Sequence, residues 1–226
     1  MRGALLALIN SGFACATALA CAAGLGCSAR SASAPHAVPP PAPPPELETD
    51  EYTRYELLDP ESSRFRIVYD VTAISPGATL YFNPIRKGSV ASDERVTDLM
   101  TGDELRFETV SGDGARRAGV PDAERDTSYI RIHLPRPVPA GGQVRLRIEK
   151  TYRDPKSYFS RGGRIVFDRS LSIRRDAVLL PAGYELVSCN EPSQVLSEPD
   201  GRLLVSFFHA GGGETPLVIE ARRLPR

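Results

Sequence analysis

The feature that most constrains the fold is a period of two in the apolar residues from residue 50 onward. Phe65, Ile67, Tyr69, Val71 and Ala73 alternate with mostly polar neighbours. Such alternation buries one face of a β-strand and leaves the other face in water. The same pattern recurs in residues 130–134, 144–148, 165–167, 184–188, 203–208 and 217–221. It predicts about nine to eleven short strands and no long amphipathic helix.

Turn signals separate these segments. Ser75-Pro76-Gly77 and Thr101-Gly102-Asp103-Glu104 each lie between two alternating segments. We therefore expect two hairpins, formed by residues 65–73 with 80–82 and by residues 95–100 with 105–107. The predicted fold class is all-β, an antiparallel β-sandwich of immunoglobulin-like or related type, in a single domain covering residues 50–226.

The segment before this domain has the pattern of an export signal. Arg2 is followed by an apolar run from Ala4 to Ala23, and the next charge is Arg30. A basic start followed by an apolar stretch is typical of a secretory signal peptide, which we place at residues 1–27. Because the uncharged run approaches the length that spans a bilayer, a retained anchor is an alternative.

A cysteine at the end of the signal predicts a lipid anchor. Leu25-Gly26-Cys27-Ser28 resembles the end of a bacterial lipoprotein signal, with the leucine one place later than usual. This resemblance implies acylation at Cys27. Cys21 is the alternative, because Ala18-Leu19-Ala20 precedes it and also satisfies the rule for ordinary signal cleavage. Simple secretion without lipid remains open. The predicted location is the cell envelope, after export.

Residues 28–49 form a spacer between the signal and the domain. They are rich in Pro, Ala and Ser and contain two proline triplets, at 39–41 and 43–45. A segment with so few bulky apolar residues cannot form a core, and its prolines favour extended polyproline II. We expect a disordered, semi-rigid tether.

Charge and motifs exclude several function classes. The chain has 28 basic and 28 acidic residues, so no net charge attracts it to nucleic acid. Arginines at outward strand positions, such as Arg66 and Arg147, are interpreted as a solvated face. The sequence contains no zinc-hydrolase, phosphate-loop, dinucleotide or serine-hydrolase motif, so we expect no metal and no cofactor. Residues 122–126 have alternating carboxylates but depart from the calcium-loop pattern, and predict a polar turn.

Cys189 is the single cysteine of the predicted domain. The order His133, Cys189, Arg202 resembles that of the sortase transpeptidases. That resemblance implies a cysteine nucleophile, a histidine acid/base and an arginine that stabilises the oxyanion. The alternative is a half-buried structural thiol at a strand end, in keeping with the burial typical of free cysteine.

A second resemblance concerns the architecture. The segments Thr101-Gly102-Asp103-Glu104-Leu105, 134–142 and Val144-x-Leu146-x-Ile148-x-Lys150-x-Tyr152 resemble the N-terminal β-sandwich of M1-type metallopeptidases. No zinc motif accompanies them. The resemblance therefore implies a non-catalytic sandwich that packs against a partner.

Residues 151–163 are predicted to form a long connection rich in Tyr, Arg and Lys. Tyrosine and arginine are enriched at binding interfaces, and loops at the ends of sandwiches often carry recognition. The candidate binding residues are Tyr152, Arg153, Lys156, Tyr158 and Arg161. Alternatively, the two tyrosines cap the core with their hydroxyls in water.

These observations together predict a non-catalytic binding or interaction module of the cell envelope, displayed on an N-terminal lipid anchor. The expected partners are the membrane, through that anchor, and an envelope protein or glycan, but not nucleic acid. The alternative from another class is an envelope enzyme whose active site is assembled from distant residues, with Cys189 as its nucleophile.

Overall fold

The computed structural model, which describes residues 51–209 and 213–225, contains fourteen β-strands in these residues, more than the nine to eleven that the period of two predicts. The signal segment, Cys21, Cys27 and the tether lie outside the described residues. The strands are β1 (Tyr52–Leu57), β2 (Arg64–Ala73), β3 (Leu80–Pro84), β4 (Val90–Asp98), β5 (Phe107–Ser111), β6 (Ser128–His133), β7 (Val144–Arg153), β8 (Tyr158–Arg161), β9 (Arg164–Leu171), β10 (Arg175–Leu179), β11 (Tyr184–Cys189), β12 (Gln194–Ser197), β13 (Leu203–Phe208) and β14 (Thr215–Arg223). A short helix, α1 (Gly112–Arg117), and a 3-10 turn (Pro60–Ser62) complete the described elements.

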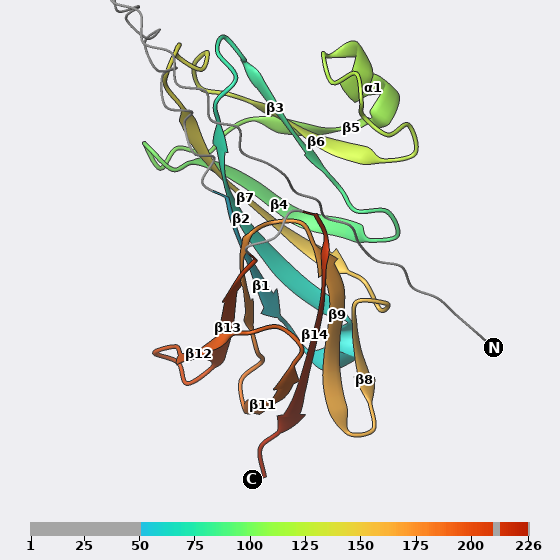
Figure 1. Ribbon diagram of the computed structural model, residues 1–226. Coiled ribbons are helices and arrows are strands. Elements are labelled where there is room, and N and C mark those ends of the chain that lie inside the picture. The colour runs from blue at the N-terminus through green and yellow to red at the C-terminus, as the bar shows by residue number, and fades with distance from the viewer. Residues whose placement is uncertain (1–50, 210–212, 226) are drawn as a thin grey trace, which may run out of the picture. The chain divides into compact units, whose positions relative to one another are not determined.

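The strands form three sheets (Figure 1). A seven-stranded sheet, here the large sheet, has the order β12-β13-β10-β1-β2-β7-β4. A four-stranded sheet has the order β11-β14-β9-β8, and a three-stranded sheet has the order β3-β6-β5. All neighbouring strands are antiparallel except β1 and β10, which run parallel. The all-β sandwich prediction is therefore confirmed, with one parallel pair that local patterning did not indicate.

One face of the large sheet packs against both smaller sheets. Phe65 on β2 lies 5.4 Å from Phe167 on β9, centroid to centroid, and Tyr55 on β1 lies equally close to Phe167. Ile130 and Ile132, on β6 of the three-stranded sheet, are fully buried in the same apolar cluster. Each such side chain contributes about 1.5–3 kcal/mol through burial, so this inner face holds the three sheets together.

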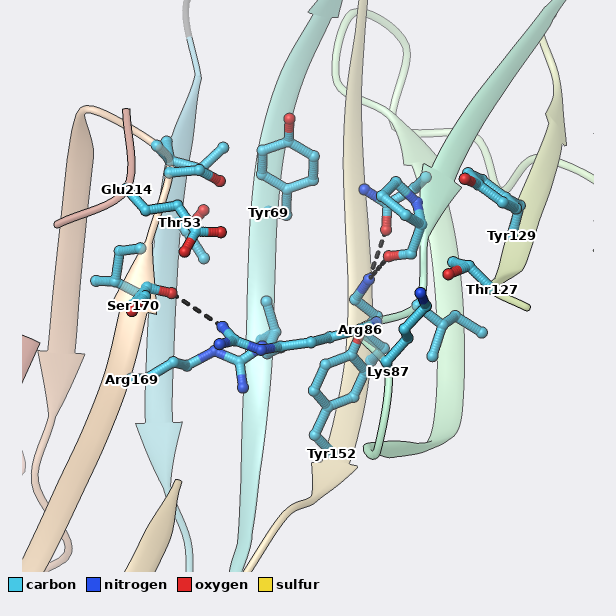
Figure 2. Close-up of a pocket in the computed structure, with 18 of the residues that line it drawn as sticks. Thr53, Tyr69, Arg86, Lys87, Thr127, Tyr129, Tyr152, Arg169, Ser170 and Glu214 are labelled. Carbon is cyan, nitrogen blue, oxygen red and sulfur yellow. Dashed lines mark hydrogen bonds between the residues drawn. The ribbon is translucent and has the colours of Figure 1, made fainter. Parts of the chain in front are cut away.

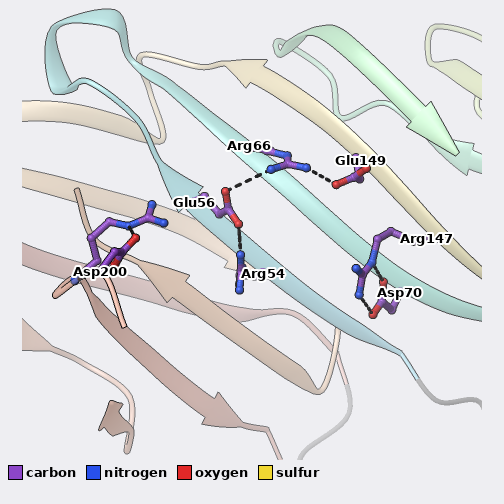
Figure 3. Close-up of polar contacts among 8 residues, drawn as sticks. Arg54, Glu56, Arg66, Asp70, Arg147, Glu149 and Asp200 are labelled. Atoms are coloured by element: carbon purple, nitrogen blue, oxygen red, sulfur yellow. Dashed lines mark hydrogen bonds and ion pairs between the residues drawn. The ribbon is translucent and has the colours of Figure 1, made fainter. Parts of the chain in front are cut away.

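The opposite face of the large sheet carries the arginines that the sequence placed outward. Arg147 donates to both carboxylate oxygens of Asp70, at 2.7 and 2.8 Å. Arg54 pairs with Glu56, and Arg66 pairs with Glu149 and, at 3.6 Å, with Glu56 (Figure 3). Opposite charges on neighbouring strands thus compensate one another across β1, β2 and β7. This outer face is largely self-neutralised.

The first predicted hairpin was wrong about its strand partner, and the second forms only in part. After the turn at residues 75–77 the chain leaves the large sheet, and β3 pairs with β6 instead of β2. The second turn does fold back, because Thr97 and Glu104 form an isolated bridge, but β5 then joins β6. Alternation identifies a strand and its buried face, whereas the choice of partner depends on packing between distant segments.

The expected long connection at residues 151–163 is mostly strand. Its first residues belong to β7, a tight turn follows at residues 154–157, and β8 pairs with β9 across Gly162 and Gly163. Both glycines have positive φ angles, of 58° and 75°, which suit a two-residue hairpin turn. Within the described residues, no helix combines the length and apolar character needed to cross a bilayer.

Candidate functional site

A cleft of about 680 Å³ opens where the three sheets meet. Its floor is the inner face of β1, β2 and β7, one wall comes from β3 and residues 122–129, and the other comes from the end of β9 (Figure 2). Sites for small molecules commonly enclose about 300–1,000 Å³ and combine apolar walls with a few polar groups. The size and position of this cleft therefore fit a small-molecule site.

Tyrosines dominate the lining. Five of them border the cleft: Tyr55, Tyr69, Tyr81, Tyr129 and Tyr152. Burial raises the pKa of Tyr55 and of Tyr81 to about 12, so these side chains carry neutral hydroxyls at physiological pH. Such rings offer flat apolar surfaces with hydroxyls that can donate or accept hydrogen bonds.

Lys150 lies on the floor, at a position where the strand pattern places an apolar residue. Along β7, Val144, Leu146 and Ile148 point inward and are fully buried, and Lys150 continues this series at 5% exposure. Its Nζ atom donates to Oδ1 of Asn83 at 2.5 Å and to the carbonyl oxygen of Pro84 at 3.3 Å. Both acceptors belong to β3, so the amine is held by a strand of another sheet.

The charge of Lys150 is poorly compensated. Burial is the main cause that lowers the pKa of its amine from 10.5 to about 7, and the nearby charge of Arg169 lowers it further, against a smaller opposite effect of Glu94. Among the described residues, no carboxylate forms an ion pair with Lys150. The ammonium and the neutral amine are therefore both populated near neutral pH.

Arg169, on β9, is the second buried cation beside the cleft. Its Nη1 lies 3.3 Å from Oδ2 of Asp154, and its guanidinium carbon lies 5.4 Å from the Phe65 ring centroid and 5.5 Å from that of Tyr152. Cation–π contacts of this kind stabilise a desolvated guanidinium. Arg169 thus has a carboxylate partner as well as aromatic ones, whereas Lys150 has an aromatic partner, the Tyr152 ring, whose centroid lies 5.1 Å from Nζ, but no carboxylate partner among the described residues.

Arg86 crosses the cleft from wall to wall. Its backbone N–H donates to the hydroxyl oxygen of Tyr152 at 3.1 Å, and its Nη1 donates to the carbonyl oxygen of Ser170 at 2.9 Å. Figure 2 shows this side chain reaching toward Ser170 beside β9. The contact connects the segment after β3 with the four-stranded sheet and fixes the width of the cleft at that point.

The carboxylates of the cleft lie at its exposed rim. Lys87 Nζ lies 2.8 Å from Glu124 and 2.8 Å from Asp126, and its hydrogen bonds lower the pKa of both carboxyls. Glu214 is exposed on the opposite side. The carboxylates therefore lie at the rim, where Lys87 neutralises two of them. The positive charge of Lys150, which has no carboxylate partner among the described residues, lies deep in the cleft.

The three residues of the sortase-like prediction belong to different parts of the fold. Cys189 ends β11 and is half-buried against the core. His133 ends β6, where its Nε2 lies 3.0 Å from Oε1 of Glu108, and Arg202 donates to Asp200 at 2.7 Å. In the described part of the chain, no hydrogen bond or ion pair joins any two of the three. No group of His, Cys, Asp and Glu there could hold a metal ion.

The predicted binding residues divide into two groups. Tyr152 and Tyr158 are buried, and the Tyr158 hydroxyl donates to the carbonyl oxygen of Leu58 at 2.9 Å. Arg153, Lys156 and Arg161 are exposed, and Arg161 lies 3.2 Å from Glu220. Both rings are buried, as the core-capping alternative expects, but their hydroxyls bond to the backbone of Leu58 and Arg86 instead of water, and Tyr152 also lines the cleft.

The sequence reasoning missed Lys150 and Arg169. A signal for each was present, because Lys150 interrupts the apolar series of β7 and Arg169 follows Ile165 and Phe167 at the same spacing on β9. A charged residue at an inward strand position is uncommon and indicates a paired or functional group. Asn83 had no comparable signal, because the inward face of β3 depends on its partner β6.

Comparisons with known proteins add information on the fold alone. No protein-family model matches the chain, and no curated protein matches it. Among solved structures, an M1 zinc metallopeptidase from Deinococcus radiodurans is 12% identical with a TM-score of 0.48, covering 75% of this chain and 40% of that one. A two-domain mutant form bound to L-tryptophan gives 12% identity and a TM-score of 0.46, covering 75% and 41%.

The chain thus spans about two fifths of the length of these metallopeptidase chains. The resemblance to M1-type metallopeptidases predicted from the sequence is found among solved structures as a weak likeness. We assign no activity from it. The fold and the site define a class only, an all-β sandwich with a tyrosine-lined cleft.

Proposed function

We propose that the protein is a non-catalytic binding module of the cell envelope, and that the cleft is its ligand site. In this proposal the N-terminal signal exports the chain, a lipid on Cys27 anchors it, and the tether at residues 28–49 holds the domain away from the membrane. Stable anchoring requires two membrane-binding signals, such as two acyl chains, whereas a single acyl chain binds the membrane only marginally.

The observation that carries this proposal is Lys150 on the floor of the cleft. A buried ammonium without a carboxylate partner costs stability, because the loss of hydration is not offset by an ion pair. A strongly shifted pKa in a cleft is a marker of a functional site. The nearby Arg169 is paired with Asp154, whereas no carboxylate among the described residues pairs with Lys150.

The surrounding groups support binding by a preformed site. Asn83, Pro84 and Arg86 hold the polar atoms of the floor and of one wall through direct hydrogen bonds. Strands of all three sheets contribute residues to the lining. Sites built on strands keep their geometry without the ligand, which lowers the cost of ordering on binding.

Retention of an envelope compound tests the proposal. The mature protein is incubated with envelope extract, and the small molecules that stay bound are identified by native mass spectrometry. Ser172 is exposed at the cleft, so Ser172→Trp is expected to obstruct it and to abolish retention. Ser160→Trp is the matched control, because Ser160 is an exposed residue of β8 that does not line the cleft. Absence of a retained compound, or equal retention by both variants, contradicts the proposal.

A further inference from the structure

The hydrogen bonds of Lys150 leave one donor unassigned. An ammonium group has three N–H donors. Asn83 Oδ1 and the Pro84 carbonyl oxygen accept two of them, and both acceptors are uncharged. The lysine lines the cleft. The remaining donor can therefore be used by a molecule bound there.

The other basic groups of the cleft have charged or polar partners, although Nε of Arg169 is buried without a hydrogen-bond partner among the described residues. Asp154 compensates Arg169, and Glu124 and Asp126 compensate Lys87. Arg86 donates to a carbonyl oxygen, which positions it without cancelling its charge. The deep end of the cleft thus carries positive charge from Lys150, with Arg86 nearby, in surroundings that screen charge weakly.

We propose that the ligand of this cleft is a small organic acid, whose carboxylate binds Nζ of Lys150 and whose ring packs against the tyrosine walls. The inference rests on the proposed function and specifies its ligand class. The carboxylate accepts a hydrogen bond from the third N–H of Lys150 and supplies the negative charge that the floor lacks. Tyr69 on β2 and the half-buried Tyr81 on β3 line the same cleft, and an aromatic or other flat apolar body can pack against them.

Paired probes separate the charge from the shape of the ligand. A set of ring-bearing carboxylic acids, including 3-phenylpropionate, is titrated into the isotope-labelled mature protein beside the primary amide of each acid. Binding is followed by two-dimensional NMR at pH 6.5. The acids are expected to shift Lys150 and Tyr152 resonances and to bind about tenfold more tightly than the amides, as charge-assisted hydrogen bonds do.

Two variants test whether Lys150 causes this preference. Lys150→Met removes the ammonium while keeping a long apolar side chain. Asn83→Asp keeps Lys150 and places a carboxylate on its Nζ atom, so the site is neutralised internally. Both are expected to lose the preference for acids over amides. Arg95→Met removes an exposed positive charge that pairs with Glu104 outside the cleft, and is expected to retain it.

The outcomes distinguish this inference from the proposed function. If acids and amides bind the cleft equally well, or if the preference survives in folded Lys150→Met and Asn83→Asp, the organic-acid inference is wrong and a binding module remains. If no pair binds, the organic-acid inference is wrong, and the retention experiment decides the proposed function separately. The dispersion of the NMR spectrum reports whether each variant is folded, and the nearly isosteric Asn83→Asp serves if Lys150→Met does not fold.

Discussion

The Nζ atom of Lys150 lies 2.5 Å from Oδ1 of Asn83, so a buried amine of the large sheet is held by a strand of the three-stranded sheet. The two residues are 67 positions apart in the chain. Their contact fixes the amine at the bottom of the cleft and also joins two sheets. The predictions below follow from this arrangement and from the buried charges around it.

Removing the amine is expected to stabilise the fold. Because burial lowers the pKa of Lys150 to about 7, the folded state carries a penalty for its charge at and below that pH. The penalty disappears as pH rises from about 7 to the value of an unfolded lysine, so this group makes stability rise over that range. Lys150→Met is expected to gain about 1–3 kcal/mol at pH 6, a gain that shrinks at pH 9. Urea denaturation at both pH values measures it, and a loss of stability at pH 6 contradicts it.

Ligand affinity is expected to fall with rising pH. An organic acid needs the ammonium form of Lys150, which becomes scarce above pH 7. The charged groups that act on this amine are Arg169 and Glu94. Affinity for the acids should therefore fall by up to about tenfold per pH unit above 7, while affinity for the amides stays level. Calorimetric titration between pH 6 and 9 measures both, and parallel curves for acid and amide would be inconsistent with the role of Lys150.

Asp176 gives a second, opposite dependence on pH. Its side chain on β10 is buried, neither carboxylate oxygen has a hydrogen-bond partner in the described residues, and burial raises its pKa to about 8. His209 Nε2 lies 3.9 Å away, beyond hydrogen-bond distance. Because the folded state holds the proton more tightly than the unfolded state, this group makes stability fall as pH rises from about 4 to about 8.

Asp176→Asn removes that titration and keeps the shape of the side chain. It is expected to raise stability by about 1–3 kcal/mol at pH 8, with little change at pH 4. Thermal unfolding at the two pH values measures the difference. An equal effect at both would show that Asp176 does not titrate in this range.

The lipid anchor is tested at the mature N-terminus. If Cys27 is acylated, the protein partitions with membranes, and Cys27→Ala stalls processing or releases it. Mass spectrometry of the mature N-terminal peptide identifies the modified residue. A mature chain that begins with an acylated Cys21 would move the anchor to the alternative position, and an unmodified N-terminus would end the lipoprotein hypothesis.

Much of the fold could be predicted from local pattern, but little of the site could. The alternation from Phe65 to Ala73 identified β2 and its buried face, because strand geometry fixes which side chains share a face. It could not show that β3 pairs with β6, since that choice is made by packing across the sandwich. Lys150 interrupts the apolar series of β7, a signal that the sequence prediction did not use. Its partner Asn83 and the parallel contact of β1 with β10 depend on tertiary structure, which a single sequence does not display.

Titration of the Lys150 side-chain resonances tests the central claim most directly. In the ligand-free mature protein, the Nζ signal is expected to titrate near pH 7, and saturation with a bound organic acid is expected to raise that pKa, because the carboxylate stabilises the ammonium. The amide of the same compound should leave the titration unchanged. An Nζ signal that titrates near 10.5, with or without the acid, would contradict both the desolvated floor and the role of Lys150 in binding.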